Sequence, residues 1–171
     1  MSLCGFSGSR SLPVSFSPVA AALVAFAGGR GLRVAVGCAH GADSLVRAAA
    51  PGAVVFSVAA FGDVPVRQAL ASRSAALVRA VAASGPSALF VGLVSGPCPA
   101  GVVPALSWRS GVVPSGSWSS CALAFGLGVP LVVAWCGGPS PSLPAWGDWV
   151  PLAVPGCSVP CFLLSPAPLL L

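Results

Sequence analysis

Two stretches of the chain each combine an apolar strand with a glycine turn, and the second of them continues into the start of a helix. They are LCGFSGSR at residues 3–10 and RVAVGCAHGADSLVRAAA at residues 33–50. The apolar runs are continuous rather than alternating, which is typical of parallel strands covered by helices on both faces. A strand followed by a tight turn and a helix is half of a βαβ unit, and repeated units build a parallel sheet. The sequence therefore predicts an α/β fold.

Five repeats of this pattern occupy residues 1–135. We expect strands at residues 3–7, 33–37, 53–59, 88–94 and 129–135, and helices from 17–18 to 28–29, 43 to 50, 66 to 83 and 117 to 127. Ser17 suits the N-cap of the first helix and Pro18 its first helical position. The order predicts a Rossmann-like, mainly parallel sheet of about five strands, sandwiched by helices.

The C-terminal part differs in composition, because residues 136–171 contain eight prolines. We interpret residues 1–135 as a ligand-binding domain and residues 136–171 as a Pro-rich tail that wraps around it. The tail has room for one edge strand at residues 161–164, since proline is incompatible with a central strand.

Composition limits the function classes. With 171 residues, 56% hydrophobic and 6% charged, the chain has ample apolar surface for one folded domain and is not a disordered protein. A mean hydropathy of +0.96 requires that a small membrane protein be considered, as a distant alternative. Prolines interrupt the uncharged stretch between Arg109 and Asp148, however, and leave runs too short to span a bilayer.

Seven cysteines, without any CxxC pair, do not form an evident disulfide framework or zinc site. Buried thiols in a reducing compartment explain them better, so we expect a cytoplasmic protein without a metal or other cofactor.

A ligand site is expected beyond the carboxyl ends of the parallel strands, where open α/β sheets bind their ligands. The turns that fall there lie at residues 8–10, 37–43, 95–96 and 115–117. Free backbone N–H groups at the starts of the following helices attract anions. The loop at residues 95–114 is longer than an ordinary connection, which favours a functional role. The net charge of +5 also supports an anionic ligand.

Three of these turns resemble those of a known superfamily. The sequences GSR at 8–10, GCAHGAD at 37–43 and SGSW at 115–118 are similar, in the same order, to turns of the SLOG superfamily. This Rossmann-like group contains the DNA-processing protein A family and the Lonely Guy cytokinin-activating phosphoribohydrolases. The resemblance covers about residues 3–135. It implies binding of a nucleotide or nucleotide-derived ligand at the strand ends.

The chain also departs from this superfamily. His40 stands where the DNA-processing branch often has arginine, and the chain contains no glutamate, the residue that the Lonely Guy enzymes use for glycosidic cleavage. We therefore expect little or no phosphoribohydrolase activity. If the chain is an N-glycosidic hydrolase of nucleoside monophosphates, Asp43 and His40 are the catalytic candidates.

The candidate ligand-binding residues come from these turns and from the helix at residues 66–83. They are Gly8, Ser9, Arg10, Gly37, His40, Gly41, Asp43, Arg73, Ser95, Gly96, Ser115, Gly116, Ser117 and Trp118.

Several of these residues have a structural alternative. Arg10 binds a phosphate or pairs with Asp43, and Asp43 bonds a ribose hydroxyl or caps a helix. Arg73 contacts the ligand, as the resemblance to Lonely Guy proteins implies, or is a solvated helix residue. Trp118 belongs to the core or stacks on a base.

The expected partner is a nucleotide-like small molecule, with single-stranded DNA as the main alternative and a second copy of the chain as a further one. Arg67, Arg73 and Arg79 are six residues apart and do not share one helical face. A general DNA-coating surface is therefore not expected.

Overall fold

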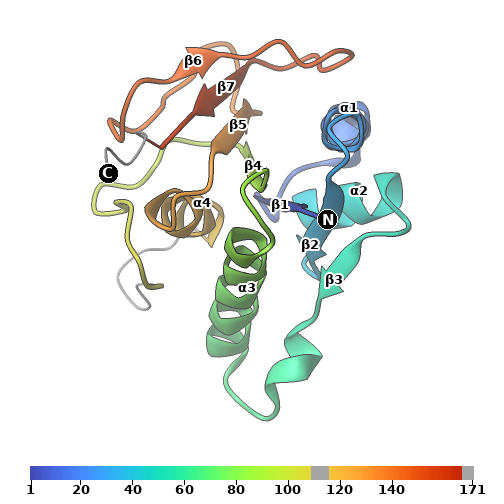
Figure 1. Cartoon of the computed structure of the whole chain (residues 1–171), viewed down its shortest axis with the longest axis vertical. Helices are drawn as coiled ribbons and strands as arrows, with labels where there is room; N and C mark the ends of the chain where they lie inside the picture. Colours follow the sequence, from blue (N-terminus) through green and yellow to red (C-terminus); the bar gives the residue numbers. More distant parts are fainter. Residues whose placement is uncertain (109–115, 167–171) are drawn as a thin grey trace.

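A seven-stranded sheet forms the centre of the computed structural model, which describes residues 1–108 and 116–166. The strands lie in the order β3-β2-β1-β4-β5-β7-β6 (Figure 1). Their bounds are β1 Leu3–Gly8, β2 Arg33–Gly37, β3 Val54–Phe56, β4 Leu89–Val94, β5 Leu131–Trp135, β6 Val150–Pro151 and β7 Cys161–Leu164. The five strands from β3 to β5 pair in parallel. The predicted α/β fold with a mainly parallel sheet is confirmed.

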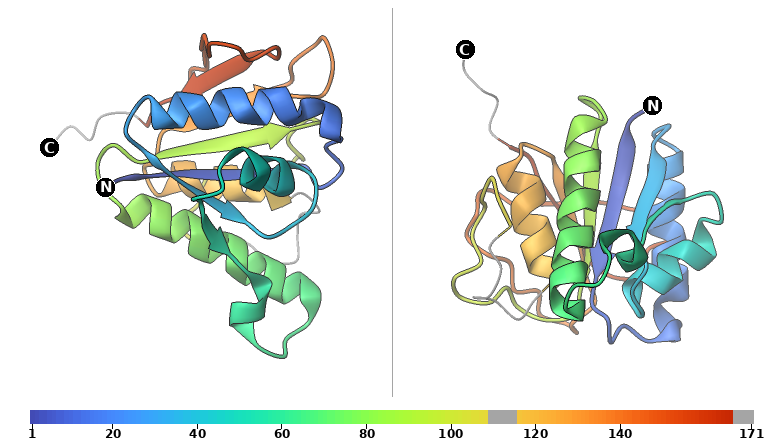
Figure 2. Two further views of the ribbon diagram at one scale, coloured as in Figure 1. Left: turned by 90° about the vertical axis from the view of Figure 1, so that its right-hand side faces the viewer. Right: turned by 90° about the horizontal axis from the view of Figure 1, so that it is seen from below.

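Four helices cover the sheet: α1 Ser17–Gly28, α2 Ala42–Ala49, α3 Val66–Ala83 and α4 Gly116–Gly126. One buried cluster joins α1 and α2 to one face of the sheet, and a second joins α3 and α4 to the other (Figure 2). Alternate residues of a strand serve the two clusters, as Phe90 and Val91 of β4 do. This arrangement explains why the strands are apolar on both faces, and the predicted sandwich of helices is confirmed.

Most boundaries differ from those predicted by at most two residues, and two of the differences have a clear local cause. The third strand ends at Phe56, because the chain then turns into the short 3-10 helix η2, Val58–Phe61. The N-cap of α1 is Phe16 and not Ser17, because a preceding 3-10 helix, η1 Val14–Phe16, brings the chain into α1 early. The hydroxyl of Ser17 donates to the carbonyl oxygen of Val14 instead.

The tail extends the sheet, so the prediction of about five strands was two too few. The predicted strand at residues 161–164 is confirmed as β7, but its predicted place at the edge is wrong, because β7 pairs antiparallel with both β5 and β6. The rule on proline still holds, since Pro160 precedes β7, no proline lies inside it, and Pro151 occupies the outer strand β6. The division of the chain at residue 135 stays a prediction.

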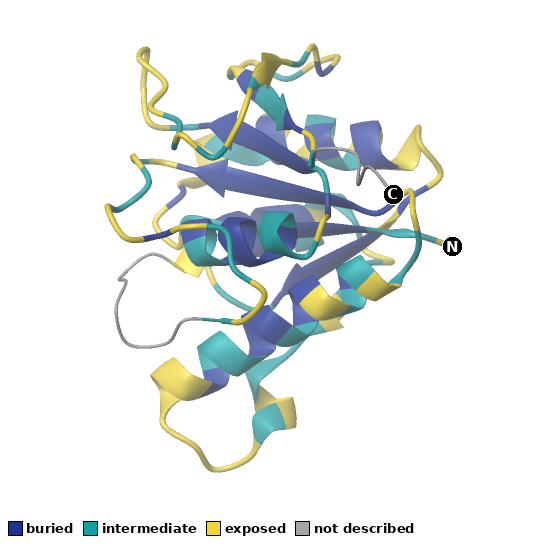
Figure 3. Cartoon of the chain, turned by 60° about the vertical axis from the view of Figure 1, so that its left-hand side comes forward, coloured by how far each residue is buried: buried dark blue, intermediate teal, exposed yellow. Residues whose placement is uncertain are grey.

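The longest described helix, α3, has 18 residues and includes Arg67, Arg73 and Arg79. Within residues 1–108 and 116–166, no helix combines the length and apolar character that crossing a membrane requires. The N-terminal end of α3 and the preceding loop project beyond the sheet and are largely exposed (Figure 3).

Candidate ligand-binding cleft

An open cleft of about 1490 Å³ lies at the carboxyl ends of β1 and β4, bordered by α3 and α4. This is the point where the strand order reverses, because β1 has β2 on one side and β4 on the other. Ten of the predicted site residues line the cleft: Gly8, Ser9, Arg10, Asp43, Arg73, Ser95, Gly96, Gly116, Ser117 and Trp118. Most of the residues predicted for the site thus lie around one cleft, although the cleft also has many lining residues that were not predicted.

Arg73 and Asp43 form a buried ion pair at the base of this cleft. Nη1 of Arg73 donates to Oδ2 of Asp43 at 2.7 Å, and the two side chains are only 7% and 5% exposed. Nη2 of Arg73 donates to the hydroxyl of Ser74 at 3.1 Å, while Nε is buried and has no hydrogen-bond partner. Oδ2 of Asp43 also accepts from the backbone N–H of Ala39 at 3.1 Å. One donor of the buried guanidinium is thus unsatisfied.

Gly37, at the end of β2, makes room for this ion pair. A Cβ atom at residue 37 would overlap Nη1 of Arg73 and crowd Oδ2 of Asp43. Arg73 comes from α3, thirty residues after Asp43 in α2, so its guanidinium has to cross the end of β2 to reach the carboxylate. The absence of a side chain at residue 37 permits that crossing.

The turn that follows β2 is fixed by Arg47 of α2. Nη1 of Arg47 donates to the carbonyl oxygens of Gly37 at 2.7 Å and of Ala39 at 3.2 Å. Sequence analysis missed this role, because a cation in the last turn of a helix is adequately explained by the helix dipole. No local signal in the sequence indicates that its side chain reaches back to the turn.

The turns after β1 and β2 are also bound to one another. The N–H of Ala42 donates to the carbonyl oxygen of Ser9 at 3.0 Å. Gly41, with φ of 66°, packs its Cα against the backbone of Ser9 and Arg10, where any side chain would collide. The two turns therefore form one rigid wall of the cleft.

The opposite wall comes from the residues after β4 and from α4. The indole Nε1 of Trp118 donates to the carbonyl oxygen of Gly96 at 2.9 Å, and the residue is 2% exposed. Its ring meets that of Trp146 edge to face, with centroids 5.7 Å apart. This packing agrees with the core alternative for Trp118. Ser117 and Gly116 begin α4, and Gly116 is exposed to the cleft.

Other predicted site residues lie elsewhere. Gly37 and Gly41 support the cleft from behind, and His40 is exposed and does not line it. Ser115 lies outside the described residues. Asp43 pairs with Arg73 rather than with Arg10, which is exposed, and Arg73 is not the solvated helix residue that was the alternative.

Positive charge is concentrated around the cleft. Arg10, Arg67 and Arg79 line it together with Arg73, whereas Asp43 is the only acidic residue among its described lining. The three arginines of α3 were predicted to lie on different faces of the helix. In agreement with this, Arg73 is buried while Arg67 and Arg79 are exposed. All three line the cleft nonetheless, because its lining along α3 runs from Arg67 to Arg79.

In the described part of the chain, no three His, Cys, Asp or Glu side chains form a group able to hold a metal ion. Comparison with known proteins adds nothing to this geometry. A scan against protein-family models finds no matching family, and searches of the curated proteins and of the solved structures find no match either.

Proposed function

We propose that the protein binds a nucleotide or nucleotide-derived ligand in the cleft, with a phosphate group of the ligand directed at Arg73. The observation that carries this proposal is the unpartnered Nε of a guanidinium whose side chain is 7% exposed. A buried donor without a partner costs about 1–3 kcal/mol. A phosphate oxygen would remove that cost, because phosphate accepts from the fork of donors that arginine presents.

The surrounding elements support an anionic ligand of this kind. The helix α4 has 11 residues and begins at Gly116, so its positive end faces the cleft. Gly96 and Gly116 line the cleft, and the space around them is open, so no side chain keeps a ligand from their backbone. The similarity of the three turns to the SLOG superfamily points to the same class of ligand.

Binding without cleavage is the form of this proposal that the residues favour. The carboxylate of Asp43 is already engaged by Arg73 and by the N–H of Ala39, and His40 is outside the cleft. Hydrolysis of an N-glycosidic bond needs a carboxylate that is positioned at the reacting carbon. We therefore propose a binding protein rather than a hydrolase.

A thermal-shift panel tests the proposal, with AMP, ADP, adenosine, ribose 5-phosphate and inorganic phosphate. We expect the phosphorylated compounds to raise Tm, since a ligand at a hundredfold excess over its Kd stabilises by about 2.7 kcal/mol. Arg73→Lys should abolish the shift, because lysine keeps the positive charge opposite Asp43 but lacks the planar fork of donors and the Nε–H group that would bind the phosphate. Arg33→Ala, at the exposed start of β2, is the matched control and should retain the shift. No shift at millimolar nucleotide would refute the proposal.

Single-stranded DNA is the second candidate, favoured by the presence of Arg10, Arg67 and Arg79 around the same cleft. If the cleft holds a strand, affinity should fall with salt at a slope of about −0.7 per phosphate contact. Arg67→Ala and Arg79→Ala should then each flatten the slope, whereas a mononucleotide site would leave oligonucleotide binding weak and insensitive to these changes.

A further inference from the structure

Two cysteines of the tail face each other on the side of the sheet that α1 covers. The sulfur atoms of Cys157 and Cys161 are 3.6 Å apart. Both thiols also point at the carbonyl oxygen of Val159, at 3.6 Å from Cys157 and 3.7 Å from Cys161. Among the described residues, no other two cysteine sulfurs come within hydrogen-bonding distance of each other. The pair belongs to the loop at residues 157–161, and Cys136 is a third thiol in its neighbourhood.

The two thiols differ in exposure. Cys157 is half-buried, whereas Cys161, the first residue of β7, is 5% exposed. Burial, with a smaller effect of the neighbouring Cys157, raises the pKa of Cys161 to about 12. Because the thiolate is the nucleophile in thiol–disulfide exchange, Cys157 is the one that a reagent from solution meets first.

We propose that Cys157 and Cys161 are a modification site for small-molecule disulfides of the glutathione class, which convert the pair into an internal disulfide. A disulfide bond joins sulfurs about 2.05 Å apart, so the two atoms need to approach by roughly 1.5 Å. Cys157 lies in a turn region outside any helix or strand, so rotation of its side chain can supply this movement without disturbing β7.

The exchange takes place in two steps. The thiolate of Cys157 attacks one sulfur of the small disulfide, breaks its S–S bond and releases one small thiolate. The thiolate of Cys161 then attacks the sulfur of Cys157, forms the internal bond and releases the second small thiolate. The two cysteine protons pass to the two released thiolates. Two cysteines are oxidised and one small disulfide is reduced, so atoms and electrons balance.

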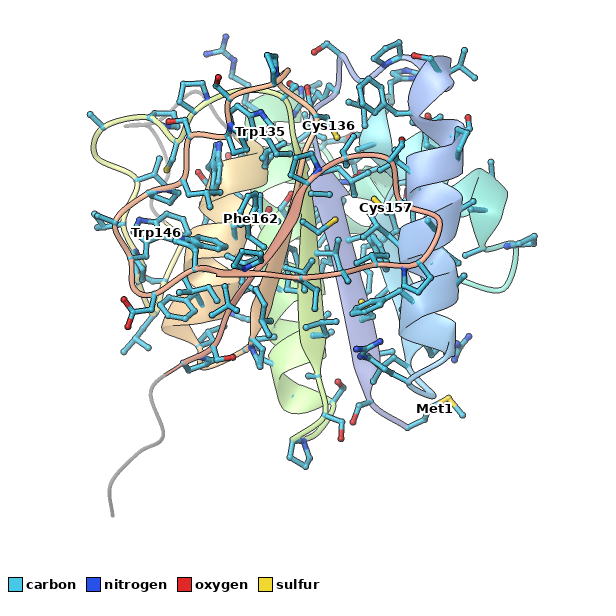
Figure 4. All side chains as sticks on the ribbon, turned by 90° about the horizontal axis from the view of Figure 1, so that it is seen from above. Met1, Trp135, Cys136, Trp146, Cys157 and Phe162 are labelled. Atoms are coloured by element: carbon cyan, nitrogen blue, oxygen red, sulfur yellow. The ribbon has the colours of Figure 1, made fainter. Side chains whose placement is uncertain are left out.

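Closing the pair would connect two parts of the tail that meet different elements. Residues around Cys157 pack on α1, where Ala22 is the neighbour of Gly156, while Cys161 pairs with Ala134 of β5. Cys136, just after β5, lies on the same side of the sheet as Cys157 (Figure 4). An internal disulfide would thus fasten the loop over α1 to the sheet, independently of any ligand in the cleft.

Peptide mapping of the whole reduced chain tests the proposal. The protein is incubated with oxidised glutathione, quenched with acid, treated with N-ethylmaleimide and digested with chymotrypsin. Cleavage after Leu152 and Phe162 gives a peptide of residues 153–162 that contains both cysteines. We expect this peptide to become the main oxidised product, unlabelled and lighter by about 2 Da, the mass of the two hydrogens lost. Dithiothreitol should reverse the change.

Cysteine variants distinguish the role of Cys157, which attacks the small disulfide, from that of Cys161, which closes the internal disulfide. Cys161→Ser should leave glutathione on Cys157, Cys157→Ser should leave Cys161 unmodified over the same time, and Cys98→Ser should react as the parent chain does. Cys98 is the matched control because it is also half-buried, but its thiol donates to the carbonyl oxygens of Pro99 and Val102 and makes no hydrogen bond with another thiol. A main product that joins Cys157 to Cys136, or glutathione on Cys98 while the peptide of residues 153–162 stays fully labelled, would overturn the proposal.

Discussion

Arg73 and Asp43 hold opposite charges in a nearly dry environment at the end of the sheet. Each side chain is more than nine-tenths buried, and they meet at 2.7 Å. Removing two charges from water is costly, and the cost is offset here by their attraction and by the hydrogen bonds from Ala39 and to Ser74. Loss of one member of the pair should therefore lower the stability of the fold strongly, because the other is then a buried charge without a partner.

Asp43→Ala should consequently destabilise the chain strongly. Loss of one member of a buried pair typically costs about 3–5 kcal/mol. The free energy of unfolding, measured by urea denaturation, is expected to fall by that order. Asp148→Ala, which removes an exposed carboxylate of the tail, is the control and should change little. Equal, small losses in the two variants would mean that the ion pair does not contribute to stability.

Gly37→Ala tests the close approach of Arg73 to the backbone of β2. The added methyl group would overlap the guanidinium, so the ion pair has to separate or β2 has to shift. We expect a fall in the free energy of unfolding together with loss of nucleotide binding in the cleft. Gly52→Ala is the matched control, since a Cβ atom there meets nothing within 4 Å. If both glycine variants behave alike, the proposed crowding at residue 37 is wrong.

Helices and parallel strands could be predicted well wherever their signals are local. The bounds of α3, residues 66–83, agree in sequence and structure because Pro65 precedes it and Ser84 and Gly85 follow it. The glycine turns also marked the ends of the parallel strands correctly. The bounds of β7 were also predicted, but its place inside the sheet was not, because that place depends on pairing with β5, which lies farther back in the sequence, and with the two-residue strand β6.

For the candidate site too, the parts with local sequence signals could be predicted and the contacts between distant residues could not. Its backbone turns could be predicted because glycine and serine before a helix are local signals. The partner of Asp43 could not, because Arg73 and Arg10 are both plausible in the sequence, and only the crossing of α3 past Gly37 selects Arg73. Arg47 was missed for a related reason, since its contact with the turn depends on how α2 packs beside β2.

Phe162→Pro should separate the tail from the sheet. Phe162 lies in the middle of β7, opposite Val133 of β5 and Pro151 of β6, and proline there removes a donor from the ladder. We expect the free energy of unfolding to fall by more than about 1 kcal/mol, the net value of one hydrogen bond, because strand packing is lost as well. Ser142→Pro, in an exposed loop of the same tail, should be nearly neutral in the same denaturation experiment. A neutral Phe162→Pro would contradict the position of β7 between two strands.

The whole molecule combines a parallel α/β sheet, an antiparallel extension from the tail, and one cationic cleft. The tail reaches the vicinity of this cleft, since the N–H of Cys136 donates to the carbonyl oxygen of Val94 at 2.7 Å, beside Ser95. Of the seven arginines within residues 1–108 and 116–166, four line the cleft. The net charge of +5 therefore acts mainly where the parallel strands end, and it attracts anions to the proposed site.

Isothermal titration of AMP and of adenosine into the parent chain and into Arg73→Lys tests this account most directly. The two ligands differ only in the phosphate group, and the two proteins differ in the donors that would bind it. We predict that AMP binds the parent chain at least about tenfold more tightly than adenosine, a difference of roughly 1.4 kcal/mol, and that Arg73→Lys removes this preference. Equal affinity of AMP and adenosine for the parent chain, or a preference for AMP that survives in Arg73→Lys, would contradict it.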